Sequence, residues 1–312
     1  MKTRLIAFVL LFLVSCETVV DNIPETRLPK TASKLVVHSF ISPQNTQINV
    51  AVTESTPLFS DMDGKEDVIE TALVKISDEM NEITIPFDPK TGLYSIDQSK
   101  FPIVASKTYT LHVSEGERVV TAHCQVPGNT PVIQSYSLDT TTGSHFSRED
   151  TALVLKMSWQ DIPNDTNYYR VRAQGEMEYS VPDAGPAGKR TRSELDFSWQ
   201  ESSGHSEWQS DRNLDGSLFS SPTGRLFIPT FITPAPSSGS PPKQHDSQFR
   251  LIALTMMVYN SDVNYYKYHR SVQQRMDTEN PLSEPSQIYS NIDGGLGCFG
   301  AYTAGKLIYR PE

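Results

Sequence analysis

The sequence is poor in cysteine, in basic charge and in long apolar runs. It has 3 cysteines and 7 histidines in 312 residues, and their spacing matches no common metal-binding pattern. With 27 Lys and Arg against 37 Asp and Glu, the net charge of −10 repels a phosphate backbone, so we expect no nucleic-acid binding. No apolar run reaches the roughly 20 residues that a membrane-spanning helix needs. These shortages argue against cysteine–histidine metal centres, nucleic-acid binding and helical spans.

The first residues form the pattern of an export signal. Lys2 and Arg4 precede ten apolar residues, and the run ends in Leu-Val-Ser-Cys16, which resembles the lipobox of bacterial lipoproteins. We therefore expect residues 1–15 to be a lipoprotein signal peptide. Cys16 is then the lipidated N-terminus, and residues 16–33 form a flexible tether between the lipid and the body. The alternative is an ordinary secretory signal with an incidental cysteine.

If Cys16 carries lipid, two cysteines remain, Cys124 and Cys298. An exported compartment permits a disulfide between them. The alternation of Val120, Ala122 and Cys124 places Cys124 on an apolar strand face, where a free thiol behaves as a small hydrophobe. The pattern favours free thiols and leaves the bridge open.

The remaining chain predicts a mainly β fold with two antiparallel β domains. Residues 34–128 contain short segments of period two, such as 47–52 and 108–113, separated by turns. They predict a sandwich of the immunoglobulin or transthyretin type. Residues 129–312 predict a larger β domain, with longer strand candidates such as 249–259.

One helix is predicted in the second domain, near residues 262–276. Ser261 or Asp262 can cap it by accepting a free N–H of the first turn. A stripe at helical spacing is formed by Tyr265, Tyr268, Val272 and Met276. We interpret this stripe as the face that packs on a sheet, with His269 mainly on another face.

Three motifs follow one another near the C-terminus. They are Val263-Asn264-Tyr265-Tyr266-Lys267-Tyr268, then Glu284-Pro285, then the run 289–300, which reads YSNIDGGLGCFG. In their order and spacing the sequence resembles the DUF4249 family of Bacteroidetes outer-membrane lipoproteins, over essentially the whole chain after the signal. The family has no assigned activity. The resemblance implies an outer-membrane location. Its members are often encoded beside TonB-dependent transporters, which implies an accessory role in nutrient uptake.

The glycines of the last motif have a physical interpretation of their own. Gly294, Gly295 and Gly297 permit positive φ and close backbone approach, which predicts a tight structural loop against a sheet. The segment lacks the Lys-Ser/Thr of a phosphate-binding loop, so it is not interpreted as one.

The strongest candidate for a cofactor site in the sequence is a calcium loop, and the run Asp61-Met62-Asp63-Gly64 matches such a loop less well. Asp211, Asn213 and Asp215, followed by Gly216, match the first half of an EF-hand loop. The twelfth position is Pro222, where a bidentate glutamate is needed. The same residues make a good hairpin turn, so turn and calcium site both stay open.

These features together predict a non-enzymatic, lipid-anchored outer-membrane protein that binds a solute or assists a TonB-dependent transporter. One alternative is a surface hydrolase acting on glycans or peptides, with a site assembled from distant residues. The run Gly204–Trp208 resembles a nucleophile elbow around Ser206, but Trp208 stands where a glycine is needed. A second alternative is a purely structural envelope protein. The ligand, the partner and the membrane face stay open.

Overall fold

The computed structural model describes most of the body of the chain. The described residues are 32–56, 67–145, 148–181, 189–202, 206–228, 231–232, 245–246, 248–277 and 287–311. Within them the chain is mainly β with one α-helix, as predicted. None of the helices described is long and apolar enough to cross a membrane. The predicted signal 1–15, Cys16 and the tether up to residue 31 lie outside the described residues.

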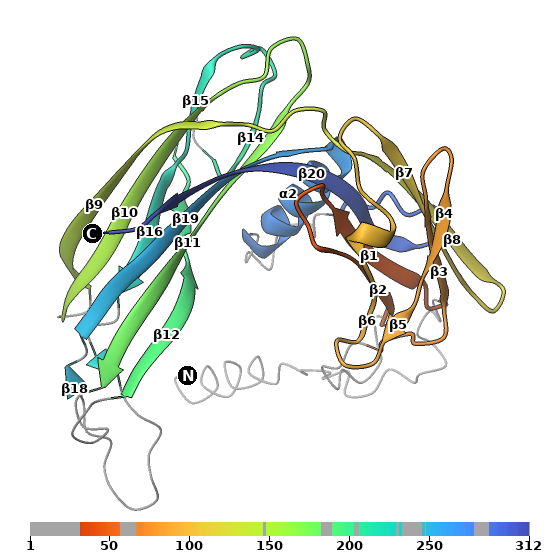
Figure 1. The fold of residues 1–312 in the computed structure, drawn as a ribbon, viewed down its shortest axis with the longest axis horizontal. Coiled ribbons are helices and arrows are strands. Elements are labelled where there is room, and N and C mark those ends of the chain that lie inside the picture. Colours follow the sequence, from red (N-terminus) through yellow and green to blue (C-terminus); the bar gives the residue numbers. More distant parts are fainter. Residues whose placement is uncertain are drawn as a thin grey trace, which may run out of the picture.

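The first unit is a sandwich of two sheets around one core (Figure 1). Its elements are β1 (Leu35–Ile41), β2 (Gln47–Glu54), β3 (Leu73–Ser77), β4 (Glu82–Ile85), β5 (Phe87–Asp88), β6 (Leu93–Asp97), the 3-10 helix η2 (Gln98–Lys100), β7 (Thr108–Glu115) and β8 (Arg118–Gln125). One sheet has the order β4-β3-β7-β8, and β1, β2, β6 and β5 belong to the other. Strict alternation of buried and half-buried residues along β1 explains why it forms a strand over this core.

The second unit has two main sheets around its own core, and β17 and β18 form a separate two-stranded sheet. Its strands are β9 (Ile133–His145), β10 (Arg148–Gln160), β11 (Tyr168–Val181), β12 (Lys189–Asp196), β13 (Ser198–Gln200), β14 (Trp208–Ser210), β15 (Leu218–Ser220), β16 (Thr223–Ile228), β17 (Phe231–Ile232), β18 (His245–Asp246) and β19 (Gln248–Ser261). One sheet is built on β10, and the other runs β12-β11-β19. Trp159, Tyr169 and Phe219 pack together in the core between them.

Strand β20 (Leu296–Tyr309) joins the two units. Its first half pairs with β1 in parallel and its second half pairs with β19 in an antiparallel direction, so one sheet runs through both units (Figure 1). The parallel pair departs from the purely antiparallel pattern expected for each unit. It arises because the C-terminal strand returns to the first strand of the body. The predicted boundary between residues 128 and 129 stays a prediction.

The helix α2 spans Val263–Asp277 and lies beneath β20 at the junction of the units (Figure 1). Of the two predicted caps, Ser261 and Asp262, it is Asp262 that caps the helix, by accepting from the Tyr265 N–H at 2.8 Å. Two details of the predicted stripe were wrong. His269 packs against Phe40 and Trp208, and Met276 is 74% exposed. Tyr265 and His269, four residues apart, face the sheet together, whereas the last turn of α2 lies in solvent.

Candidate functional site

The site begins with the carboxylate of Asp262, between β19 and α2. Its Oδ1 atom accepts from the backbone N–H of Tyr265 at 2.8 Å and of Ala301 in β20 at 3.2 Å. Its Oδ2 atom accepts from the Asn264 amide at 3.3 Å. Burial raises the pKa of this carboxyl to about 6, although these donors and the Gln125 N–H favour the ionised form. One side chain thus ties the helix to strands of both units.

Two asparagine side chains cover the outer edge of β8. Asn264 and Asn291 each donate to the carbonyl of His123, at 3.1 and 3.2 Å. Beside them, the backbones of Thr121 and Asp293 form a bridge. An uncovered strand edge leaves peptide groups unpaired, so these side chains act in place of a neighbouring strand.

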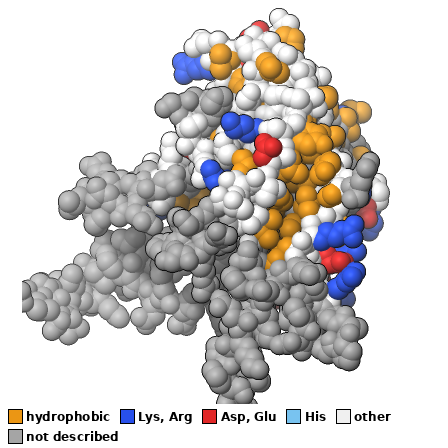
Figure 2. Space-filling view, turned by 90° about the vertical axis from the view of Figure 1, so that its left-hand side faces the viewer, with side chains coloured by type: hydrophobic (Ala, Val, Ile, Leu, Met, Phe, Trp, Pro, Cys, Tyr) orange, Lys and Arg blue, Asp and Glu red, His pale blue; other side chains and the backbone are white. Residues whose placement is uncertain are grey.

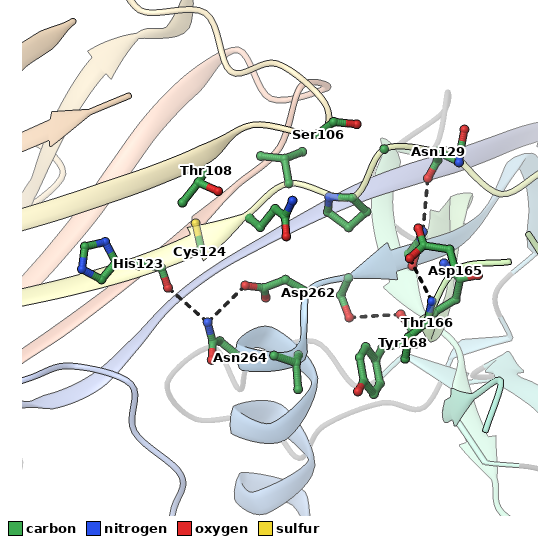
Figure 3. Close-up of a pocket in the computed structure, with 18 residues that line it drawn as sticks. Ser106, Thr108, His123, Cys124, Asn129, Asp165, Thr166, Tyr168, Asp262 and Asn264 are labelled. Atoms are coloured by element: carbon green, nitrogen blue, oxygen red, sulfur yellow. Dashed lines mark hydrogen bonds between the residues drawn. The ribbon is translucent and has the colours of Figure 1, made fainter. Parts of the chain in front are cut away.

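A polar cleft of about 580 Å³ lies where these elements meet (Figure 3). On one side it is lined by Ser106, Thr108 and Gln125, from the β7–β8 end of the sandwich. On the other it is lined by the segment 165–168. Asp262 and Asn264 lie between the two walls (Figure 3). The volume falls within the range of small-molecule sites, which lies between roughly 300 and 1,000 Å³.

Hydrogen bonds from the adjacent strands β19 and β20 of the shared sheet fix the cleft walls. The Asn260 amide donates to the Asn129 carbonyl at 3.3 Å, and the Thr303 hydroxyl donates to the same carbonyl at 2.7 Å. The Ser261 hydroxyl donates to the Tyr168 carbonyl at 3.1 Å. The walls are therefore held in place without a ligand, which lowers the entropic cost of binding one.

Aromatic packing behind the cleft fixes α2 on the sheet. The ring of Tyr265 lies 5.2 Å from Phe40 and 4.3 Å from His269. Arg170 lies over the Trp208 ring at 4.2 Å and donates to the Tyr265 hydroxyl at 3.0 Å. Burial, with the nearby Arg170 charge, lowers the pKa of His269 to about 3, so this imidazole is neutral. It serves as a packing residue there.

The glycine motif lies against the sandwich, at the start of β20. Gly294 and Gly297 have φ of 80° and 109°, which side chains rarely adopt. A Cβ atom at Gly297 would lie 2.1 Å from the Val37 carbonyl oxygen. A Cβ atom at Gly295 would lie 2.7 Å from the carbonyl oxygen of Leu35. The geometry therefore requires glycine for close approach to β1.

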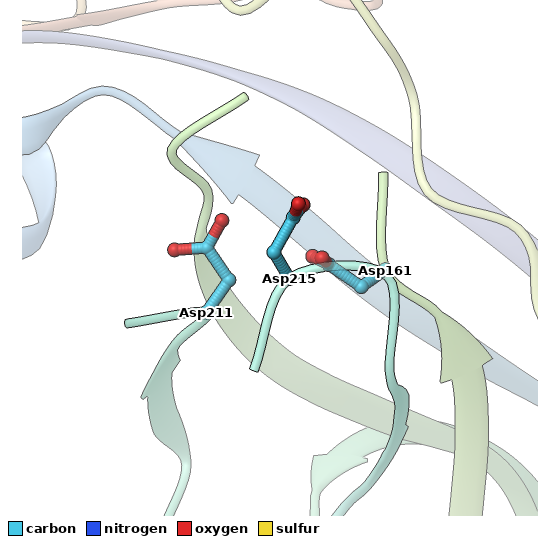
Figure 4. A group of neighbouring side chains, drawn as sticks. All are labelled: Asp161, Asp211 and Asp215. Carbon is cyan, nitrogen blue, oxygen red and sulfur yellow. The ribbon is translucent and has the colours of Figure 1, made fainter. Parts of the chain in front are cut away.

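The structure brings Asp211 and Asp215 together and adds a third carboxylate, Asp161 (Figure 4). One oxygen of each lies within 4.8 Å of the others. Asp161 accepts from the Tyr169 hydroxyl and the Gly216 N–H, and Asp211 and Asp215 each accept from a backbone N–H. Burial and the neighbouring carboxylates raise the pKa of Asp211. Asp161 therefore supplies a third carboxylate that could bind calcium. Each of the three carboxylates also has a hydrogen-bond donor from the protein, as expected for a purely structural turn.

Asn213 occupies the turn between these aspartates, with a φ of 67° in the left-handed region. Asparagine tolerates this conformation better than most residues, which supports its role in the turn. Asp161 could not be predicted from the sequence, because it lies 50 residues before Asp211 and a loop motif covers only neighbouring residues. The edge-covering role of Asn264 and Asn291 was also missed, although both belong to the C-terminal motifs.

The two remaining cysteines are free and buried. Burial raises the pKa of the Cys124 and Cys298 thiols, so both stay protonated at neutral pH. The hydroxyl of Ser206 contacts the Glu201 carboxylate and accepts from the Trp208 N–H. Neither of these two contacts of Ser206 involves a histidine.

A hydrophobic patch lies on the face of the second unit that points away from the sandwich (Figure 2). The second core also leaves half-buried apolar side chains at its margin, among them Leu138, Leu251 and Tyr309. Contiguous exposed apolar surface commonly marks contact with other proteins or with membranes. This face is the second candidate surface.

The fold and the cleft define a mainly β protein of two units that share one sheet, with a helix-capped polar cleft at their junction. The chain belongs to the family described as Domain of unknown function (DUF4249), whose model matches residues 17–308. No curated protein and no solved structure matches the chain.

Proposed function

We propose that this chain is a lipid-anchored accessory protein of the outer membrane that works with a TonB-dependent transporter in nutrient uptake. The observation that carries the anchor is the N-terminal pattern, in which ten apolar residues after Lys2 and Arg4 end at Cys16. A lipid on Cys16 holds the body at a membrane face, and the tether lets the body reach a neighbouring transporter.

Two features of the body support the accessory role. The junction cleft has the size of a solute site, and its walls are fixed by hydrogen bonds. The hydrophobic patch of the second unit suits contact with another protein (Figure 2). In this proposal the cleft captures a solute and the patch faces the transporter.

A labelling experiment tests the anchor. Cells that produce the wild-type chain, the Cys16→Ala variant or the Ser15→Ala variant are fed an alkyne fatty acid, and the protein is captured and probed for label. We expect label and membrane fractionation for wild type and for Ser15→Ala, which keeps a small residue before the cysteine. We expect neither for Cys16→Ala. Equal labelling of all three would remove the anchor from the proposal.

The hydrolase alternative would need a carboxylate free to act as acid or base in a cleft. In the junction cleft, both Asp262 oxygens already accept from N–H donors. Asp165 is exposed and accepts from the Thr166 N–H. These engagements favour solute binding over hydrolysis at this cleft.

A further inference from the structure

We propose that the junction cleft binds an uncharged, hydroxyl-rich small molecule, of which a neutral saccharide is the chemical class that fits best. The cleft lies wholly in the described body, so this inference does not depend on the lipid anchor or on a transporter. It rests on the charge of the lining, on its hydrogen-bonding groups and on its fixed walls.

The charge of the lining disfavours anions. The described residues that line the cleft include Asp165 and Asp262 but no lysine or arginine. His123 is the one basic side chain of the lining, so a phosphate or carboxylate ligand would meet two carboxylates with no permanently charged cation beside it. The chain as a whole has a net charge of −10, which adds to this repulsion.

The same carboxylates offer little to a cation. Asp262 accepts from Tyr265, Ala301 and Asn264, so its oxygens are directed at the protein. Asp165 is the remaining carboxylate, and it is exposed to solvent. A single exposed ion pair contributes at most about 1 kcal/mol, too little to define a site for a cation.

The neutral groups fit a ligand that both donates and accepts. Thr108, Gln125 and Asn129 are exposed and line the walls, and Ser106 and Thr166 add hydroxyls. Amide and hydroxyl side chains each carry donor and acceptor sites, as sugar hydroxyls do. The cleft of about 580 Å³ has room for a ligand of disaccharide size.

Binding is tested on the full chain, purified in a detergent without a sugar headgroup. Backbone amide NMR spectra are followed during titration with maltose, cellobiose and diacetylchitobiose as neutral probes. Spermidine serves as the cationic probe and glucose 6-phosphate as the anionic probe. We expect at least one neutral disaccharide to shift the amides of Gln125, Asn129 and Thr166 saturably, and the charged probes to leave them unchanged.

A matched pair of variants locates the site. Gln125→Arg places a long charged side chain in the cleft, whereas Gln134→Arg makes the same change on exposed β9. We expect Gln125→Arg to weaken saccharide binding at least about tenfold and Gln134→Arg to change it by less than about twofold. Asn129→Arg, on the opposite wall, repeats the test if Gln125→Arg lowers the thermal unfolding temperature.

Three results would overturn the inference. They are shifts at these amides with spermidine or glucose 6-phosphate alone, no saturable shift with any of the neutral disaccharides, and equal weakening by Gln125→Arg and Gln134→Arg. None of them bears on lipidation of Cys16 or on transporter capture, so failure here and failure of the proposed function are distinguishable.

Discussion

The side-chain amide of Asn264 donates a hydrogen bond of 3.1 Å to the main-chain carbonyl of His123. Asn264 lies in the first turn of α2, in the second unit, and His123 lies in β8 of the sandwich. Through the Asn264 side chain, α2 of the second unit therefore pairs with a peptide group at the edge of the sandwich sheet. The same amide donates to Asp262. The cleft owes its shape to this contact and to the shared strand β20.

Replacing Asn264 with alanine should destabilise the fold. The variant loses the bonds to His123 and Asp262, and it also loses the acceptor for the Tyr289 hydroxyl. The His123 and Asp262 oxygens keep other N–H donors, so the group left without its partner is the partly buried Tyr289 hydroxyl, and this costs roughly 1–3 kcal/mol. Urea unfolding of Asn264→Ala measures the loss. Asn49→Ala on the exposed face of β2 is the control, with an expected change of under about 0.5 kcal/mol. Equal losses in both variants would contradict the edge-covering role.

Stability should depend on pH through Asp262. Its pKa is about 6 in the folded state against 3.8 for an ordinary aspartate, so the folded state binds the extra proton between these values. The contribution of Asp262 is therefore most favourable below about pH 4 and is lost as the pH rises through 6. Asp262→Asn does not titrate. Relative to wild type it should gain roughly 2 kcal/mol between pH 4 and pH 7, measured by urea unfolding.

Asp97→Asn provides a control of opposite sign. The hydrogen bonds from Ser99 lower the pKa of Asp97, so its contribution is present at neutral pH and is lost as the pH falls. Relative to wild type, Asp97→Asn should therefore lose stability as the pH rises through the range in which Asp97 ionises. If the stabilities of Asp262→Asn and Asp97→Asn, each relative to wild type, changed with pH in the same direction, burial would not be the cause of the raised pKa of Asp262.

Gly297 and Gly92 separate steric contact from backbone strain. Both have positive φ, but a Cβ atom at Gly297 would meet the Val37 carbonyl at 2.1 Å, whereas Gly92 has open space. Gly92→Ala should cost only the left-handed strain of about 1–2 kcal/mol. Gly297→Ala should cost more than about 4 kcal/mol and greatly reduce the yield of folded protein. Similar unfolding midpoints for the two variants would contradict the close approach to β1.

Removing the charge of Asp211 from the group of three aspartates should stabilise the folded protein. Burial and the carboxylates of Asp161 and Asp215 raise the pKa of Asp211, so its ionised form is unfavourable in the folded state. Asp211→Asn keeps an oxygen that accepts from Asn167 and removes the repulsion. We expect its thermal unfolding temperature to exceed that of wild type by a few degrees at pH 7. The difference in unfolding temperature should vanish below about pH 3, where the protonated aspartate of wild type is as neutral as the asparagine of the variant.

Calcium distinguishes the two interpretations of this group. We expect 1 mM calcium to leave the wild-type unfolding temperature unchanged relative to EDTA, because each carboxylate already accepts from the protein. A rise with calcium that Asp211→Asn abolishes would identify a calcium site, since a bound ligand stabilises the state that binds it. Magnesium at the same concentration is the control for general ionic effects.

Local patterns in the sequence predicted local features of this fold. Alternation along residues 47–52 predicted β2, and the capping preference of Asp262 predicted where α2 begins. These features depend on neighbours within a few residues. The close approach at Gly297 also followed from the nature of glycine, without its partner Val37.

Long-range placement was beyond such patterns. Nothing near Leu296 indicates that β20 pairs in parallel with β1, some 260 residues earlier in the chain. His269 was placed off the packing face of the helix because its partners, Phe40 and Trp208, come from strands of different units. Asp161 joined the aspartate group for the same reason. In each case tertiary packing decided the position, and the local period did not.

Capture from native membranes tests the central claim most directly. Membranes from cells that produce tagged wild-type chain are gently cross-linked, the protein is purified by its tag, and its partners are identified by mass spectrometry. Cys16→Ala is the matched control. The account predicts a TonB-dependent transporter in near-equal amount with wild type and much less with Cys16→Ala. No transporter with wild type, under conditions that preserve a known transporter complex, would contradict it.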